Sequence, residues 1–258
     1  MKVTGYQQGQ PCWAELASTD WAAAKVFYQS LFNWQAIDLS IPDGHYTLLQ
    51  IDNEDVAAMY QLSGAMGIDA PTHWTVYFAV NDVDDTIELI KQAGGQLIVG
   101  PHNVGDAGRM ALFADPEGSR FAIWQAINHI GIKQAQIPNT LCWVELACRD
   151  TQQASEFYAK TLGLQPQKVD MSGIEYTEWH VAAQAVGGMM QMSAEWGDIP
   201  AHWMLYFAVE DCDATVTRAI DLGAKICVPP TDIAHVGRYA VINDPQGGIF
   251  SVIALAES

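Results

Sequence analysis

The chain has 258 residues, of which 50% are hydrophobic and 16% are charged. Twelve Lys and Arg residues oppose 30 Asp and Glu residues, which gives a formal net charge of −18. This balance argues against a nucleic-acid partner or an anionic membrane surface, because both need clustered basic side chains. The apolar fraction is enough for sizeable cores and excludes a wholly disordered chain.

Targeting and cysteine signals are sparse. No apolar run approaches the roughly 20 residues that a membrane helix needs, and no secretory signal is visible at the N-terminus. The five cysteines contain no CxxC pair, so they form neither a disulfide framework nor a zinc knuckle. They are Cys12, Cys142, Cys148, Cys212 and Cys227. Scattered thiols are typical of small core residues in a reducing compartment, and we expect a cytoplasmic protein.

The chain repeats itself at an offset of about 130 residues. The repeated pairs are PCWAELASTD (11–20) with LCWVELACRD (141–150), HWTVYFAVND (73–82) with HWMLYFAVED (202–211), and GRMALFADPEG (108–118) with GRYAVINDPQG (237–247). The register changes by one residue over a whole half, which chance does not produce. We therefore predict two homologous modules, residues 1–127 and 137–258, that pair within the chain around a pseudo-twofold axis.

Each module is predicted to contain two units of the same kind. In the first module, a strand CWAELA precedes a helix that Asp20 caps and that runs to Phe32. A second strand, WTVYFAV, precedes a helix that starts at Asp82 and ends at Gly94-Gly95. The expected short strands are HYTLLQI (45–51), VAAMYQL (56–62), QLIVGP (96–101), RMALFAD (109–115) and SRFAIWQ (119–125). The strand-helix-strand-strand-strand order, present four times, predicts an α+β fold with curved mixed sheets.

These motifs resemble the vicinal oxygen chelate superfamily of glyoxalases, extradiol dioxygenases and bleomycin-binding proteins. The residues that carry the resemblance are YFAVND-VDDT (77–86), Gly94-Gly95, Pro101, Gly108-Arg109 and DPEG (115–118), with their copies in the second module. The similarity covers nearly the whole chain and is strongest to a two-module, glyoxalase-like subgroup. It implies sheets that form cups, in which metal-binding members place His, Gln or Glu. Lyase or oxidoreductase chemistry is one expectation, but the fold does not fix it.

At the three positions where the resemblance would place metal ligands, this chain has other residues. They are Trp13, Thr75 and Ala122 in the first module, and Trp143, Met204 and Ser251 in the second. None of the six is a usual donor to a transition metal, which takes imidazole, carboxylate or thiolate. We therefore predict no cofactor, or a divalent metal if this alignment is misplaced.

Glutamate and histidine remain as candidate catalytic groups in the cups. Strand residues i and i+2 share a face, so Glu15 and Glu145 lie beside the tryptophans of their strands, and His73 and His202 open later strands. In relatives with paired modules a cup often combines strands of both. This places Glu145 with His73, and Glu15 with His202, as acid–base pairs. The alternative is that each histidine hydrogen-bonds only the backbone at the start of its strand.

Aromatic and basic residues complete the predicted ligand-binding set. The members are Trp13, Trp143, Thr75, Tyr77, Trp124, Arg109, Met204, Tyr206 and Arg238. An aromatic wall suits a flat apolar ligand. Each arginine has two interpretations: a clamp for an anionic ligand group, or a structural partner of Glu15 or Glu145 or of the adjacent turn.

If the cups combine both modules, they are not equivalent. The one with His73, Thr75 and Trp124 is expected to be more polar and to bind ligand better. The one with His202, Met204 and Ile253 is expected to be tighter.

Searches for phosphate loops, GxGxxG, HExxH and GxSxG find nothing, which weighs against NTPases, Rossmann dehydrogenases, zincins and α/β-hydrolases. Three functions remain: binding of a small organic molecule without metal, a metal-dependent lyase or dioxygenase, and a metal-independent enzyme that uses Glu-His acid–base chemistry.

Overall fold

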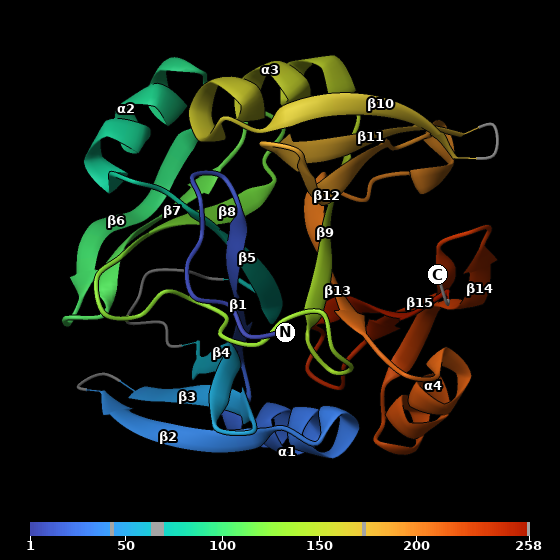
Figure 1. Cartoon of the computed structure of the whole chain (residues 1–258). Coiled ribbons are helices and arrows are strands. Elements are labelled where there is room, and N and C mark those ends of the chain that lie inside the picture. Colours follow the sequence, from blue (N-terminus) through green and yellow to red (C-terminus); the bar gives the residue numbers. More distant parts are fainter. Residues whose placement is uncertain (42–43, 63–69, 172–173, 257–258) are drawn as a thin grey trace.

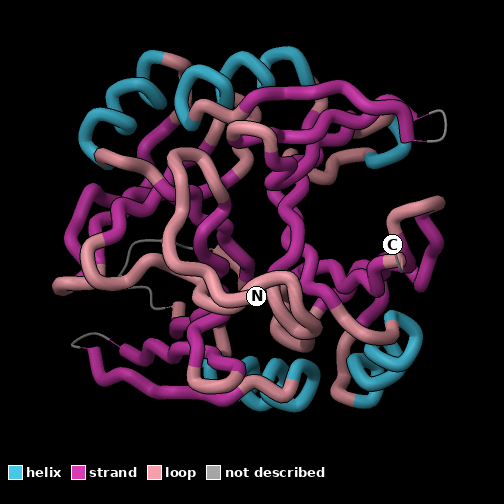
Figure 2. Tube along the Cα trace, viewed as in Figure 1, coloured by secondary structure: helices cyan, strands magenta, loops and turns pink. Residues whose placement is uncertain are grey.

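The computed structural model describes the whole chain except residues 42–43, 63–69, 172–173 and 257–258. It contains two eight-stranded sheets and four α-helices (Figure 1). The helices lie in two pairs at opposite ends of the molecule, with the strands between them (Figure 2). None of the helices in the described part of the chain has the length and apolar character needed to cross a membrane.

Both halves have the same element order, as the duplication predicts. The elements of the first half are β1 (Pro11–Ser18), α1 (Trp21–Phe32), β2 (Gln35–Ile41), β3 (Gly44–Ile51), β4 (Glu54–Gln61), β5 (His73–Ala79), α2 (Val83–Gln92), β6 (Gln96–Val104), β7 (Gly108–Ala114) and β8 (Arg120–Ala126). Those of the second are β9 (Leu141–Cys148), α3 (Thr151–Leu162), β10 (Gln165–Met171), β11 (Ile174–Val181), β12 (Gln184–Gln191), β13 (His202–Ala208), α4 (Cys212–Asp221), β14 (Lys225–Ile233), β15 (Gly237–Asn243) and β16 (Ile249–Leu255). The α+β prediction is confirmed.

Each sheet belongs to one half of the chain. The strand orders are β2-β3-β4-β1-β5-β8-β7-β6 and β10-β11-β12-β9-β13-β16-β15-β14. The two units of a half join through the antiparallel pair β1–β5, or β9–β13, and β5 continues to β8 in parallel. The assumption that a cup combines strands of both modules is therefore wrong, because the central hydrogen-bonded pair connects the two units of the same half.

Aspartate caps begin the four helices. Asp20, Asp82, Asp150 and Asp211 each accept a hydrogen bond from the backbone N–H three residues later, which satisfies one of the free donors of the first turn. The sequence assigns Asp20 and Asp82 to helix starts, and Asp150 and Asp211 are their copies in the second half.

The helix face of each sheet packs against the other half. The α1 hydroxyl of Tyr28 donates to Asp244 at 2.7 Å, and the α3 hydroxyl of Tyr158 donates to Asp115 at 2.9 Å. These aspartates are the first residues of the two DPxG turns. Helices α2 and α3 lie side by side at one end, and α1 and α4 at the other (Figure 1). The modules therefore bury their helix faces together and leave the opposite faces of both sheets for other partners.

One strand escaped the sequence analysis. QAIDLSI forms β2, the edge strand of the first sheet. Its alternating apolar residues Ile37 and Leu39 are exposed rather than buried, because an edge strand at the rim of a curved sheet has little to pack against. Its pattern is therefore weaker than that of the central strands.

Candidate ligand-binding cups

Glu15 lies at the centre of the first sheet, on the face opposite the helices. Tyr46 from β3 donates its hydroxyl proton to one carboxylate oxygen of Glu15 at 2.8 Å, and Tyr77 from β5 donates to the other at 2.7 Å. Thr75 is the cross-strand neighbour of Glu15. We call this face of the first sheet, defined by Trp13, Glu15, Tyr46 and Tyr77, the first cup.

The second sheet repeats the cluster with equivalent residues. Tyr176 donates to Glu145 at 2.7 Å, and Tyr206 donates to its other oxygen at 2.9 Å. The indole N–H of Trp143 donates to the Tyr176 hydroxyl at 3.0 Å. We call the face defined by these four residues the second cup. The two halves therefore share one carboxylate held between two tyrosines.

Burial changes the ionisation of the clusters. It raises the pKa of Glu15 and of Glu145 above the usual glutamate value, although the tyrosine hydrogen bonds act in the opposite direction. Burial and the adjacent carboxylate also raise the pKa of Tyr77 and Tyr206, so these phenols stay protonated. Each cup thus holds a carboxyl group that binds its proton more tightly than an exposed glutamate does.

The two histidines hydrogen-bond the backbone at the start of their strands, as the alternative interpretation proposed. The Nδ1 atoms of His73 and His202 lie 2.8 Å from the carbonyl oxygens of Pro71 and Pro200. Since a carbonyl only accepts, Nδ1 carries the proton in the neutral ring and Nε2 keeps a free lone pair. Burial lowers the pKa of His73, which favours its neutral form.

The predicted pairing of glutamate with histidine across the modules does not occur. Glu15 shares its sheet with His73, and Glu145 shares its sheet with His202, because β1–β5 and β9–β13 are the central pairs. Tyrosine, not histidine, contacts each carboxylate. Sequence reasoning missed Tyr46 and Tyr176. The repeat itself contained the signal, since both tyrosines precede a threonine at equivalent positions of the two modules.

The two arginines lie away from the cups. Arg109 forms an ion pair with Asp84 of α2 at 2.8 Å, and Arg238 forms one with Asp213 of α4 at 2.6 Å. Neighbouring strand residues face opposite sides, so Arg109 occupies the helix face while Met110 and Trp124, which are register partners, face the cup. The interpretation that pairs the arginines with Glu15 and Glu145 is wrong. Each arginine instead connects a strand of its sheet to a helix of the same half, Arg109 to α2 and Arg238 to α4.

The first cup has an aromatic wall, formed by residues of one half of the chain and of the connector. The ring centroids of Trp13 and His129 lie 4.8 Å apart in an edge-to-face arrangement, and those of Trp124 and His129 lie 6.3 Å apart. The indole of Trp124 donates to the His129 carbonyl at 2.8 Å. His129 belongs to the connector between the modules, and its ring approaches Asp55 at 3.2 Å. The connector therefore braces the wall of the first cup.

Exposure differs between the cups in a direction that was not expected. Trp13, Thr75 and Met110 are buried, whereas their counterparts Trp143, Met204 and Tyr239 are partly exposed. The sequence predicted that the larger Met204 side chain would make its cup tighter, but the residues of the second cup are more exposed than those of the first. Glu15 and Glu145 are both partly exposed.

The residues at the superfamily's metal positions do come together in space. Strands β1, β5 and β8 are neighbours, and the register pairs Tyr77 with Ala122 and Glu15 with Thr75. The donor chemistry at these positions does not fit a metal, because Trp13, Thr75 and Ala122 supply no imidazole, carboxylate or thiolate. Within the described ranges, no three His, Cys, Asp or Glu side chains gather in a metal-binding group.

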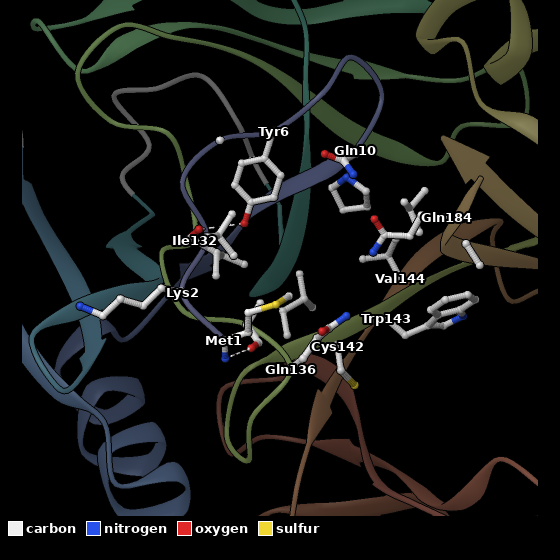
Figure 3. A pocket seen from close by; sticks show the side chains of 17 residues that line it. Met1, Lys2, Tyr6, Gln10, Ile132, Gln136, Cys142, Trp143, Val144 and Gln184 are labelled. Carbon is white, nitrogen blue, oxygen red and sulfur yellow. Dashed lines mark hydrogen bonds between the residues drawn. The ribbon is translucent and has the colours of Figure 1, made fainter. Parts of the chain in front are cut away.

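A separate pocket of about 360 Å³ lies between the N-terminal segment, the connector and the second sheet (Figure 3). Tyr6, Gln10 and Ile132 line one side, and Val144 and Gln184 line the other. Of the site residues predicted from sequence, its lining includes Trp143 alone, and it includes no Asp, Glu or His. Because the pocket contains neither of the repeated Glu–Tyr clusters, we assign the candidate site to the cups.

Comparison with known proteins agrees with this architecture. The family model described as "Glyoxalase/Bleomycin resistance protein/Dioxygenase superfamily" matches twice, over residues 12–123 and 128–251. A Mycobacterium tuberculosis protein named "Putative glyoxylase CFP32" is 38% identical, over 98% of this chain and 97% of its own length. The "Anthracycline biosynthesis protein DnrV" of Streptomyces peucetius is also 38% identical, over 99% and 96%.

Solved structures share the fold at low sequence identity. The Mn(II)-bound glyoxalase from Novosphingobium aromaticivorans superposes with a TM-score of 0.66 at 14% identity, covering 97% of this chain and 83% of that one. The 2,3-dioxygenase LapB from Pseudomonas sp. KL28 gives a TM-score of 0.63 at 13% identity, covering 98% and 94%. At such identities the likeness concerns the fold and not the chemistry.

Proposed function

Because the chain belongs to the glyoxalase/bleomycin resistance protein/dioxygenase superfamily, we propose that it binds a small, planar organic molecule in its sheet cups without the superfamily's metal. The observation that carries the proposal is the Glu15 carboxyl group, held by two tyrosine hydroxyls on a face lined with aromatic rings. Binding sites of this kind combine apolar walls with a few fixed polar groups.

The first cup is the better candidate for a flat ligand. Trp13 and Trp124 approach the same histidine ring and provide two large aromatic surfaces, while Ile253 replaces Trp124 in the second cup. Aromatic side chains bind flat rings with little loss of conformational entropy. The similarity to a protein named for anthracycline biosynthesis supports a fused-ring ligand, since anthracyclines are planar polycyclic molecules.

Acid–base catalysis is the second candidate, and one observation favours it. Burial raises the pKa of Glu15, and its carboxyl group lies beside the Tyr77 hydroxyl, so the pair can exchange a proton with a bound carbonyl or phenolate. Tyr77, and not a histidine, is then the acid–base partner of Glu15. Catalysis would use the same cup and the same ligand, so binding is tested first.

The test uses quinizarin, a neutral and fluorescent anthraquinone. Titration with the protein should quench its fluorescence saturably, before and after treatment with EDTA. Loss of binding on chelation, with recovery after a divalent metal is returned, would establish the metal-dependent alternative instead. No saturable binding to either form contradicts the proposal. Chromatography with mass spectrometry of the quinizarin recovered after incubation separates binding from turnover, because turnover gives a product of different mass or, for an isomer, of different retention time.

A further inference from the structure

The second cup combines a carboxylate with four aromatic side chains. Tyr176 and Tyr206 donate to Glu145, Trp143 donates to Tyr176 at 3.0 Å, and the ring of Tyr239 lies 6.4 Å from that of Tyr206. Burial and, to a smaller extent, the charge of Glu145 raise the pKa of Tyr239. A carboxylate among electron-rich rings is the arrangement that recognises alkylated ammonium groups, through ion pairing and cation–π attraction.

The hydrogen-bond donors next to Glu145 are already used. Tyr176 and Tyr206 each have one hydroxyl proton, and both protons go to Glu145, while the Trp143 N–H goes to Tyr176. What remains free on these side chains is acceptor capacity and the faces of the rings. A ligand that matches this surface must therefore bring positive charge or polarised hydrogens.

Glu145 accepts hydrogen bonds from two tyrosines, but no basic side chain among the described residues forms an ion pair with it. The ion pairs of the second half, among the residues that the structure describes, involve other acidic side chains. A partly buried charge is costly unless a counter-charge meets it. The net charge of −18 raises the local concentration of cations around the whole protein.

The first cup is less suited to a cation. The positive charge of Arg120 acts on Tyr60 and His73 there, whereas Ile249 stands at the equivalent position of the second cup. Trp143, Glu145, Tyr176 and Tyr239 are also all partly exposed, so a ligand can reach them.

Two further differences favour a polar ligand in the second cup. The hydroxyl oxygen of Ser251 is fully buried and has no hydrogen-bond partner among the described residues. Ser251 is the cross-strand partner of Tyr206, and Ala122 takes its place in the first sheet. Gly188 makes room for Tyr176, because a Cβ there would lie 1.8 Å from the Tyr176 hydroxyl. The first sheet has Ala58 at that position.

We propose that the second cup binds the ammonium group of a small alkylated amine, with Glu145 as counter-charge and Trp143, Tyr176, Tyr206 and Tyr239 as aromatic walls. The proposal extends the proposed function by naming the chemistry of a second ligand site. It does not depend on quinizarin binding to the first cup, so either can fail alone.

The test compares choline with its neutral carbon isostere, in which a tert-butyl group replaces trimethylammonium. Each is titrated into the full-length protein, and the indole N–H resonance of Trp143 is followed by NMR after assignment with Trp143→Phe. Choline should bind at least about tenfold more tightly than the isostere, the change expected from one desolvated ammonium contact. Equal affinity for both molecules, or no shift with choline, overturns the proposal.

Variants assign the site. Glu145→Gln should weaken choline binding at least about tenfold, while the matched variant Glu15→Gln should leave it unchanged. Tyr239→Met introduces the residue of the first cup and should cost about threefold, which keeps the test sharp if Glu145→Gln folds poorly. Wild-type affinity in Glu145→Gln, or an equal loss in Glu15→Gln, contradicts the assignment to the second cup.

Discussion

In the first cup, Glu15 lies beside buried tryptophan and threonine, a connector histidine contacts the aromatic wall, and the charge of Arg120 acts on Tyr60 and His73. In the second cup, Glu145 lies among partly exposed rings, with isoleucine where the first has Arg120. The carboxylate and its two tyrosines are the same in both. The comparison teaches that duplication kept the polar centre, while the surroundings that decide ligand chemistry diverged.

The largest expected effect tests what the two halves share. Asp115→Ala and Asp244→Ala each remove a buried carboxylate that accepts a tyrosine hydroxyl from the other half and two backbone N–H groups of its own turn. Each should lower the free energy of unfolding by about 3 kcal/mol, because the donors are left unsatisfied. Urea denaturation measures both.

The control for that pair is Asp84→Ala, which removes an exposed ion pair with Arg109 and should cost less than about 1 kcal/mol. If Asp115→Ala and Asp244→Ala differed by more than about 2 kcal/mol, the two module contacts would not be equivalent.

Asp55 marks a difference between the halves, because Ala185 occupies its position in the second. Burial tends to raise the pKa of Asp55, but hydrogen bonds from His129, Lys133 and Gln50 hold it well below its usual value. Its stabilisation is therefore present above the unfolded pKa of about 4 and is lost as the pH falls. Asp55→Asn should cost about 2 kcal/mol at pH 7.

Denaturation at a series of pH values measures this effect. The wild type should lose its advantage over Asp55→Asn below about pH 4. A difference in unfolding free energy between the two proteins that stays constant down to strong acid would contradict the lowered pKa of Asp55.

Trp124 and Ile253 sharpen the comparison of the cup walls. Trp124→Ala should weaken quinizarin binding by more than about 1 kcal/mol, the scale of one aromatic contact, while Ile253→Ala should have little effect. Fluorescence titration of the two variants gives the affinities. An equal loss in both, or a loss in Ile253→Ala alone, would mean that the flat ligand occupies the other cup.

The smallest expected effect concerns proton uptake by the glutamates. Their raised pKa means that the folded state holds the proton more tightly. The stabilisation is present below the unfolded pKa of about 4.3 and is lost as the pH rises through the folded value. In Glu15→Gln and in Glu145→Gln, the stability should therefore fall less steeply with rising pH than in the wild type. Thermal unfolding of the wild type and both variants at a series of pH values measures this effect. A wild-type stability that rises as the pH increases above about 4.3 would contradict the prediction.

The sequence was informative where it repeated itself. The duplication predicted the α+β fold, the helix caps and the face shared by Trp13 and Glu15, because periodicity and caps are local properties. Tyr46 and Tyr176 were missed since their contact with the glutamates depends on how β3 and β11 curl over the centre of each sheet. The cross-module pairing failed for the same reason: which strands meet is a tertiary property that strand patterns do not contain.

The central claim is that the cups, and not the pocket beside the N-terminal segment, hold the planar ligand. A crystal structure of the protein with bound quinizarin tests it most directly. We expect the anthraquinone against Trp13 and Trp124, with a ring hydroxyl directed at Glu15. Quinizarin between Tyr6 and Gln184, with both cups free of it, would contradict the claim.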